Sequence, residues 1–240
     1  MAVTTGKAPG KRALKSSINK GFSDNIGRLA KMISKGTRNE DETRRWIIDV
    51  LKQGFGYTDD DIETEYKALG QRVDIALMEN GSVFAVIECK AVNIDIKQRA
   101  INQAANYATS LGAEWAIVTN GQAWGLYHVA TENCNTPEII EVFFVELLDE
   151  DGISKDDVEM LYLLTKKAFF SGETEISYHN AKIYDGKYLL NALLSDSVTK
   201  AVAKELVRRY KKDCGVVFED IDPAYIKQLL EIYLEPLLEQ

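Results

Sequence analysis

Three charged side chains near the middle of the chain have the types and spacing that metal-assisted hydrolysis requires. Asp74 lies in the segment RVDIAL, and Glu88 and Lys90 end the almost wholly apolar run VFAVIECK. Side chains two apart in a strand project to the same face, so Glu88 and Lys90 share a face that Asp74 can join from the neighbouring strand. Two carboxylates and an ammonium at the end of an apolar strand are costly to bury unless something compensates them.

A divalent cation would compensate these charges. The carboxylates of Asp74 and Glu88 and the backbone carbonyl of Cys89 are oxygen ligands, which favour a hard ion such as Mg²⁺ or Mn²⁺. The ion would leave positions for a water and a phosphate oxygen, and it would lower the pKa of that water. Lys90 would orient the water or stabilise charge on the phosphate. These roles predict hydrolysis of a phosphodiester bond, and a surface salt bridge between Glu88 and Lys90 is the alternative interpretation.

A second pair, Gln103 and Tyr107, lies one helical turn apart in the helix predicted after Lys90, so both side chains fall on one helix face. They could contact a substrate phosphate or Lys90. By itself the pattern Q-x-x-x-Y is also typical of an ordinary helix surface, and it becomes informative here because it follows the strand motif. The side chain of Cys89 is expected to point to the opposite face of its strand, into the core.

Apolar periodicity and turn residues predict the elements that must position these side chains. The dipeptide Asn80-Gly81 between two β-rich runs predicts a hairpin. Strands are expected over 62–69, 72–78, 82–90, 115–120, 123–129 and 139–147. Helices are expected over 23–36, 41–54, 95–111, 157–170, 187–212 and 222–238, with Ser23 as the N-cap of the first. This order predicts an α/β fold with a mixed β-sheet flanked by helices and a C-terminal helical extension.

Charge is distributed unevenly along the chain. The net charge is -8, yet residues 1–38 hold nine Lys or Arg and a single acid, Asp24. A basic segment joined to an acidic body could be a phosphate-binding arm, or it could be a solvated tail that keeps the chain soluble. We therefore expect a basic flexible arm over 1–22, a nuclease-like core over 23–150 and a helical region over 151–240.

Composition excludes several classes of protein and site. No apolar run approaches the roughly 18 residues that a membrane span needs, and the N-terminus lacks the apolar stretch of a signal peptide. We therefore expect no membrane partner and a cytoplasmic location. The scattered cysteines Cys89, Cys134 and Cys214 argue against a disulfide framework and against a zinc site. The two histidines, His128 and His179, are too few for a His-rich metal site.

Residues from about 39 to 129 resemble the N-terminal nuclease domain of type I restriction enzyme R subunits and their small stand-alone relatives. The segments that carry the resemblance follow in the family's order: NEDETRRWIIDVLKQGFGY, RVDIAL, FAVIECKAVN, QAANYA and VTNGQAWGLYHV. The sequence contains no Walker A motif and is too short for a helicase motor, so we do not expect a complete R subunit. No motif is recognised in the tail from residue 150.

The resemblance implies a restriction-endonuclease-like fold of the PD-(D/E)xK type and Mg²⁺-dependent cleavage of DNA. It implies catalytic roles for Asp74, Glu88 and Lys90, with the glutamine–tyrosine pair as accessory residues of the RecB-like branch. The family's first helix also carries an acidic residue near the metal. Glu40 matches that residue best and Glu42 is the second choice, although acids at a helix N-terminus are also favoured by the helix dipole.

The sequence supports three functional hypotheses. The leading one is a DNA nuclease, an endonuclease in preference to an exonuclease, acting in defence against foreign DNA or in DNA repair. The second is a non-catalytic module that binds nucleic acid or a protein on the same fold. The third is a helical interaction protein that acts through residues 151–240, where a homodimer would bring together two active sites for two strands.

Overall fold

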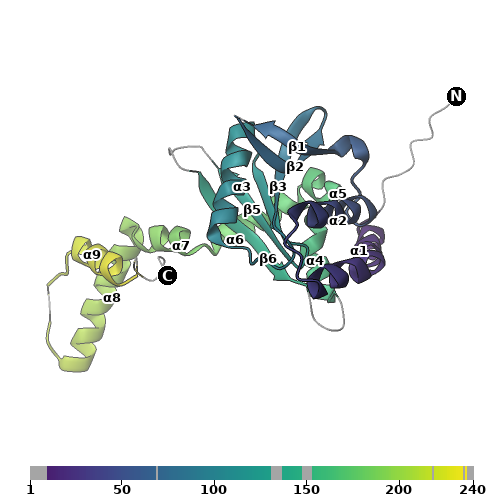
Figure 1. Cartoon of the computed structure of the whole chain (residues 1–240). Helices are drawn as coiled ribbons and strands as arrows, with labels where there is room; N and C mark the ends of the chain where they lie inside the picture. The colour runs from purple at the N-terminus through teal and green to yellow at the C-terminus, as the bar shows by residue number, and fades with distance from the viewer. Residues whose placement is uncertain are drawn as a thin grey trace. The chain divides into compact units, whose positions relative to one another are not determined.

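The computed structural model describes residues 10–68, 70–130, 137–147, 153–217, 219–234 and 236. The chain divides into two compact units, Met1–Tyr178 and His179–Gln240, which are considered separately below (Figure 1). The first unit contains the β-sheet and every candidate site residue, and the second unit is helical.

A single six-stranded sheet forms the centre of the first unit, with its strands in sequence order. Its strands are β1 (Ile62–Ala68), β2 (Gln71–Glu79), β3 (Ser82–Cys89), β4 (Trp115–Thr119), β5 (Ala123–Ala130) and β6 (Glu138–Glu146). Every neighbouring pair is antiparallel except β3 and β4, which are parallel. A parallel pair needs a crossover connection, which helix α3 (Gln98–Leu111) provides. The predicted mixed sheet is therefore confirmed.

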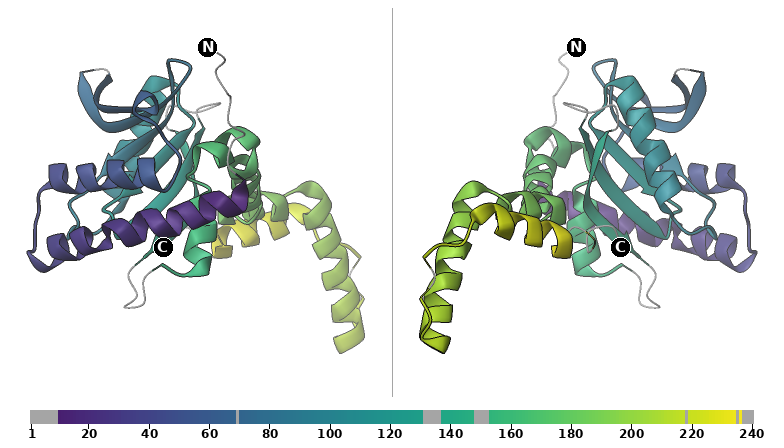
Figure 2. Two further views of the ribbon diagram at one scale, coloured as in Figure 1. Left: turned by 90° about the vertical axis from the view of Figure 1, so that its right-hand side faces the viewer. Right: turned by 90° about the vertical axis from the view of Figure 1, so that its left-hand side faces the viewer.

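Helices cover both faces of this sheet (Figure 2). Helix α3 packs through its alanines onto one face, in an apolar cluster that includes Val86 of β3 and Val118 of β4. The other face is covered by α1 (Lys11–Ser34) and α2 (Glu40–Gln53), whose aromatic rings pack edge-to-face with each other and with Trp124 of β5. The sheet is thus a central layer, as an α/β core requires.

A tight turn joins β2 and β3 and sets their pairing as far as Met78, where the register shifts by one residue. Asn80 and Gly81 both have positive φ, 52° and 79°. Two consecutive residues of that conformation form the tight turn whose twist matches an antiparallel hairpin. The predicted hairpin is confirmed, and its register pairs Glu79 with Ser82.

The first helix corrects the expected flexible arm. It begins at Lys11 and not at Ser23, so residues 11–22 are helical, while residues 1–9 lie outside the described part of the chain. Its buried apolar residues continue at helical spacing on both sides of the predicted start: Leu14, Ile18, Phe22, Leu29 and Met32. Before Ser23 the apolar residues are few, and Lys and Ser lie between them. Packing on the rest of the first unit therefore stabilises this half of the helix.

Two basic residues of this helical segment are engaged within the protein. Lys11 pairs with Glu173 and Lys15 pairs with Glu159. Both ammonium groups also lie over the ring of Tyr162, at 4.5 and 5.5 Å from its centroid. Such contacts fix the segment to the unit, so these two lysines do not belong to a mobile phosphate-binding arm.

The C-terminal helices are shorter than the sequence predicted. The stretch 157–170 forms α4 (Lys155–Tyr162) and α5 (Lys166–Ser171), because the Thr165 hydroxyl accepts the backbone N–H of Ala168 and starts a new helix. The stretch 187–212 likewise divides at Ser195. The remaining helices are α6 (Glu173–Ile183), which the sequence analysis missed, α7 (Gly186–Leu193), α8 (Asp196–Cys214) and α9 (Pro223–Leu234).

The expected boundary at residue 150 is also corrected, because α4 and α5 belong to the first unit. The Tyr57 hydroxyl donates to the carbonyl oxygen of Leu164 at 2.9 Å. The Lys166 ammonium lies 2.8 Å from Asp61 and 2.6 Å from Glu79. These contacts tie the segment after the sheet back onto the residues that follow α2 and onto β2.

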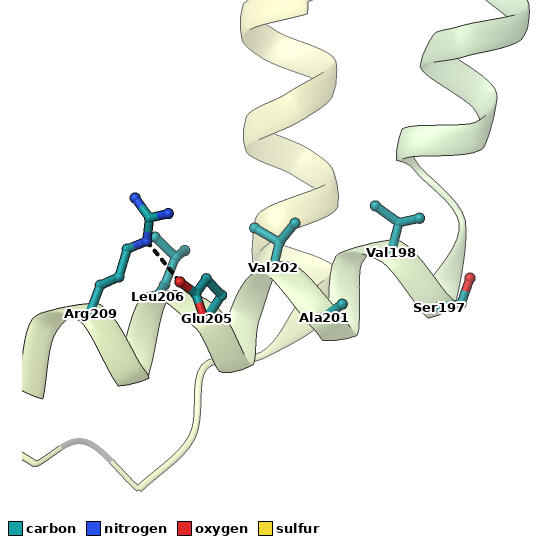
Figure 3. A pocket seen from close by; sticks show the side chains of 7 residues that line it. All are labelled: Ser197, Val198, Ala201, Val202, Glu205, Leu206 and Arg209. Carbon is teal, nitrogen blue, oxygen red and sulfur yellow. Dashed lines mark hydrogen bonds and ion pairs between the residues drawn. The ribbon is translucent and has the colours of Figure 1, made fainter.

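The second unit exposes many large apolar side chains. Its buried residues among those described are Leu190, Thr199, Ala203 and Ile226. On α8 a hollow of about 610 Å³ is lined by seven residues shown in Figure 3: Ser197, Val198, Ala201, Val202, Glu205, Leu206 and Arg209. Across the described residues, no helix is both long enough and apolar enough to span a membrane.

Candidate functional site

Asp74 and Glu88 face each other where β2 and β3 stop pairing. The ladder pairs Ala76 with Val86 and Ile75 with Ile87, and one further step of this register brings Asp74 opposite Glu88. In place of that last backbone pair, the Asp74 carboxylate accepts the backbone N–H of Cys89 at 2.8 Å. The two carboxylates therefore lie at the end of the hairpin on adjacent strands, and the charge of Asp74 acts on Glu88.

Glu88 is deeply buried. It is only 2% exposed, and alternation along β3 puts it on the same face as Val86, which packs under α3. Burial raises the pKa of Glu88 from 4.5 to about 7, against the opposing effect of a hydrogen bond from Lys90, and the charges of Asp74 and Glu40 raise it further. A carboxylate held in this way would gain from a nearby cation.

Lys90 supplies such a cation from the residue after β3. Its ammonium is paired with the Glu88 carboxylate, and its side chain is 20% exposed. Burial works to lower the pKa of Lys90, but the hydrogen bond and charge of Glu88 outweigh burial and raise it. Lys90 is therefore an ammonium group at neutral pH and can donate hydrogen bonds but cannot accept a proton.

Arg44 also contacts the site, although no sequence motif singled it out. From α2 its guanidinium lies 3.3 Å from Asp74, 2.6 Å from Asp41 and 3.6 Å from Glu65. Its side chain is 17% exposed. The one sequence signal was the i, i+3 spacing from Asp41, which does not reveal a contact with a strand thirty residues away.

Glu65, which contacts Arg44, has an unusual backbone conformation. Its φ is +52°, a left-handed conformation that is uncommon outside glycine. The β1–β2 ladder pairs Thr64 with Ile75 and Tyr66 with Val73, but it skips the pair between Glu65 and Asp74. The two acids are bridged by a guanidinium instead, and strain of this kind is often found at functional sites.

Of the two acids considered at the start of α2, Glu40 is the one that acts on the central pair. Its charge raises the pKa of both Glu88 and Lys90. Glu42 instead accepts a hydrogen bond from the Thr37 hydroxyl at 3.4 Å. The start of α2 therefore adds a third acid to the surroundings of the site.

Gln103 and Tyr107 lie together on α3. The Gln103 amide donates to the Tyr107 hydroxyl at 3.1 Å, and Tyr107 is 8% exposed in the apolar cluster under α3. Within the described residues, neither forms a hydrogen bond with Lys90. The pair lies on the helix that covers the sheet face shared by Glu88.

Polar contacts hold the segment that follows Lys90 in place. The Thr43 hydroxyl of α2 accepts the backbone N–H of Val92 at 3.1 Å. The Asn120 amide donates to the carbonyl oxygen of Ile94 at 3.0 Å. Asn120 is also a turn residue, because its side chain accepts the N–H of Ala123 at 2.7 Å. No sequence signal predicted the contact across to residue 94.

Residues 39–142 match the family model described as the type I restriction enzyme R protein N terminus. This match confirms the resemblance, and it includes every candidate site residue from Glu40 to Tyr107. A restriction-endonuclease-like fold agrees with the mixed sheet, its flanking helices and the helical C-terminal region.

The other comparisons add little to the family match. The crystal structure of the type IIG restriction endonuclease BpuSI aligns with a TM-score of 0.36 and 11% identity over 88% of this chain. The alignment spans 23% of the length of BpuSI, and a TM-score this low does not establish a shared fold. No curated protein matches the sequence.

The candidate site offers few oxygen ligands for a metal ion. Among the described residues, no group of three or more His, Cys, Asp or Glu side chains is arranged to hold a metal ion. Magnesium is commonly bound through only one or two carboxylates, with waters and substrate phosphates completing its shell. Asp74, Glu88 and the carbonyl of Cys89 fit that smaller set, because the two carboxylates are opposite each other and Glu88 is buried.

Proposed function

We propose that this chain is a metal-dependent nuclease that hydrolyses DNA phosphodiester bonds. The observation that carries the proposal is the pair of carboxylates, Asp74 and Glu88, opposed across the β2–β3 hairpin with the Lys90 ammonium against Glu88. The relation of residues 39–142 to restriction enzyme R proteins supports DNA as the substrate. Defence against foreign DNA is the role that this relation favours, and DNA repair is the alternative.

Each residue of the site has a chemical role in the proposed reaction. Asp74, Glu88 and the backbone carbonyl of Cys89 would hold Mg²⁺ or Mn²⁺, and such an ion lowers the pKa of water and neutralises phosphate charge. Lys90 stays protonated, so it donates a hydrogen bond to a phosphate oxygen or orients the attacking water. Arg44 holds Asp74 in place through the 3.3 Å contact. Glu40 is the further acid that could approach the ion.

A plasmid assay tests the proposal directly. The purified chain is incubated with supercoiled plasmid and Mg²⁺ or Mn²⁺, with EDTA as the blank. We expect cleavage by the wild type, and none by Asp74→Ala or Lys90→Ala. Asp49→Ala is the matched control, because Asp49 pairs with Arg28 on the exposed surface of α2. A covalently closed circle has no ends, so its conversion to open or linear DNA identifies an endonuclease.

The competing hypothesis is a module that binds DNA without cleaving it. Retention of DNA in EDTA, with no product in either metal, would favour it. Equal behaviour of the wild type and the Asp74→Ala variant in the cleavage assay would exclude the nuclease.

A second function is favoured by the second unit. Leu206 is 43% exposed on the α8 hollow, and other large apolar side chains of residues 179–234 are exposed as well. We propose that this surface binds a protein partner, and that the first partner to test is a second copy of the chain. Sedimentation of the full chain should give a dimer mass that Leu206→Glu reduces and Lys204→Glu leaves unchanged. A monomer at all concentrations would exclude the homodimer.

A further inference from the structure

The exposed face of α3 forms a polar hollow, and four of the residues that line it have no role in the catalytic set. Its volume is about 720 Å³, and six residues line it: Gln98, Arg99, Asn102, Gln103, Asn106 and Tyr107. Four of these side chains are amides, one is a guanidinium and one is a phenol. Figure 2 shows α3 on the side of the sheet away from α1 and α2, and four side chains of the hollow are exposed: Gln98, Arg99, Asn102 and Asn106.

The composition of this face differs from that of an ordinary solvated helix. The helix contains no Asp or Glu, in a chain that has 37 of them, and Arg99 is its one charged residue. Solvated helix faces usually carry charges of both signs, as α8 does with Glu205 and Arg209. An amide surface without acidic side chains lacks the repulsion that carboxylates would exert on a polyanion.

Several polar groups of the hollow are available to a ligand. Arg99 is exposed and forms no salt bridge with any described residue. The Gln98 amide donates to Asn102 at 2.9 Å, which leaves the amide nitrogen of Asn102 free to donate. Asn106 is exposed, and its side chain bonds no residue in the described ranges.

The spacing of the amides suits a nucleic-acid strand. Asn102 and Asn106 are one turn apart, which is a rise of about 6 Å along the helix. Two base steps of duplex DNA rise about 6.8 Å. Asn side chains can bond base edges, and Arg side chains can bond phosphates. The hollow also shares Gln103 and Tyr107 with the candidate site.

We propose that the polar face of α3 binds DNA next to the cleaved bond, with Arg99 at a phosphate and with Asn102 and Asn106 at base edges. This inference rests on the proposed nuclease function, and it assigns residues for affinity and for sequence preference that the catalytic set does not contain.

The test measures binding without cleavage. A fluorescent duplex of about 30 base pairs, long enough to cover a specific site, is titrated with the full chain in EDTA at several salt concentrations. Arg99→Ala should weaken binding about tenfold and lower the salt slope by about one. Asn102→Ala/Asn106→Ala should weaken binding about fivefold or more with little change of slope. Asn191→Ala, an exposed amide on α7, is the matched control and should bind as the wild type does.

Cleavage products then separate this inference from the nuclease proposal. If the wild type cuts plasmid, the Asn102→Ala/Asn106→Ala variant should cut with an altered distribution of sites. If the wild type cuts and all α3 variants bind and cut like the control, the inference is wrong and the nuclease stands. If the wild type binds without cutting and the α3 variants lose binding, the inference stands and the nuclease fails. Tighter binding to single-stranded RNA of the same length would overturn the assignment to DNA.

Discussion

Replacing Glu88 with glutamine gives the sharpest test of how the site is built. Glu88 is 2% exposed, and its pKa is raised from 4.5 to about 7, chiefly by burial. Folding therefore favours its protonated form. The contribution of Glu88 to stability is fully present below pH 4.5 and is lost as the pH rises through 7. The difference between the two pKa values corresponds to about 3 kcal/mol.

The amide side chain of the Glu88→Gln variant does not titrate. We therefore expect the unfolding free energies of the wild type and the variant to diverge as the pH rises. Relative to the wild type, Glu88→Gln should gain up to about 3 kcal/mol of unfolding free energy between about pH 4.5 and pH 8. Lys90 stays an ammonium group through this range, because its pKa is raised from 10.5. Urea unfolding in EDTA at several pH values measures the difference, and about 3 kcal/mol corresponds to a midpoint shift of about 1 M.

Magnesium should narrow the difference in unfolding free energy between the two proteins. At about pH 8 an ion bound to the carboxylate of Glu88 stabilises the folded state, by about 1.4 kcal/mol when its concentration is about ten times its Kd. Glu88→Gln should lose most of this gain. The exposed carboxylate variant Glu146→Gln is the control and should follow the wild type in both experiments. If the unfolding free energies of the wild type and Glu88→Gln change in parallel with pH, the burial argument is wrong. If magnesium stabilises both proteins equally, Glu88 is not a metal ligand.

Three further changes test the elements that support the site. Arg44→Gln removes the cation that holds Asp74, so plasmid cleavage should fall about tenfold while the unfolding free energy changes by less than about 1 kcal/mol. Thr43→Val keeps the side-chain shape but removes the acceptor of a buried backbone N–H, which should lower the unfolding free energy by about 1–3 kcal/mol; an unchanged urea midpoint would contradict this. Gly21→Ala would place a Cβ 3.0 Å from the backbone of α2's C-cap and should destabilise by about 1–3 kcal/mol. Gly27→Ala, in the same helix with nothing within 4 Å, should instead stabilise by up to about 1 kcal/mol, and equal thermal shifts for the two glycine variants would be the contrary result.

The local parts of the site could be predicted from the sequence alone. The hairpin that puts Asp74 and Glu88 on adjacent strands follows from Asn80 and Gly81, whereas the one-residue register shift between Leu77 and Met78 had no sequence signal. Lys90 follows from strand alternation. The pair on α3 follows from the helical repeat, and the family match covers the same residues.

Tertiary packing decided what the sequence pattern left open. Arg44 reaches Asp74 only because α2 lies beside the end of β2, and Thr43 bonds Val92 for the same reason. The helix start at Lys11 depends on burial against the body, since its own apolar spacing is sparse. The pKa of Glu88 likewise depends on exclusion from water, which no sequence motif records. Periodicity and turn residues determine structure over a few residues. Burial and contacts between distant segments arise only when those segments meet in the folded protein.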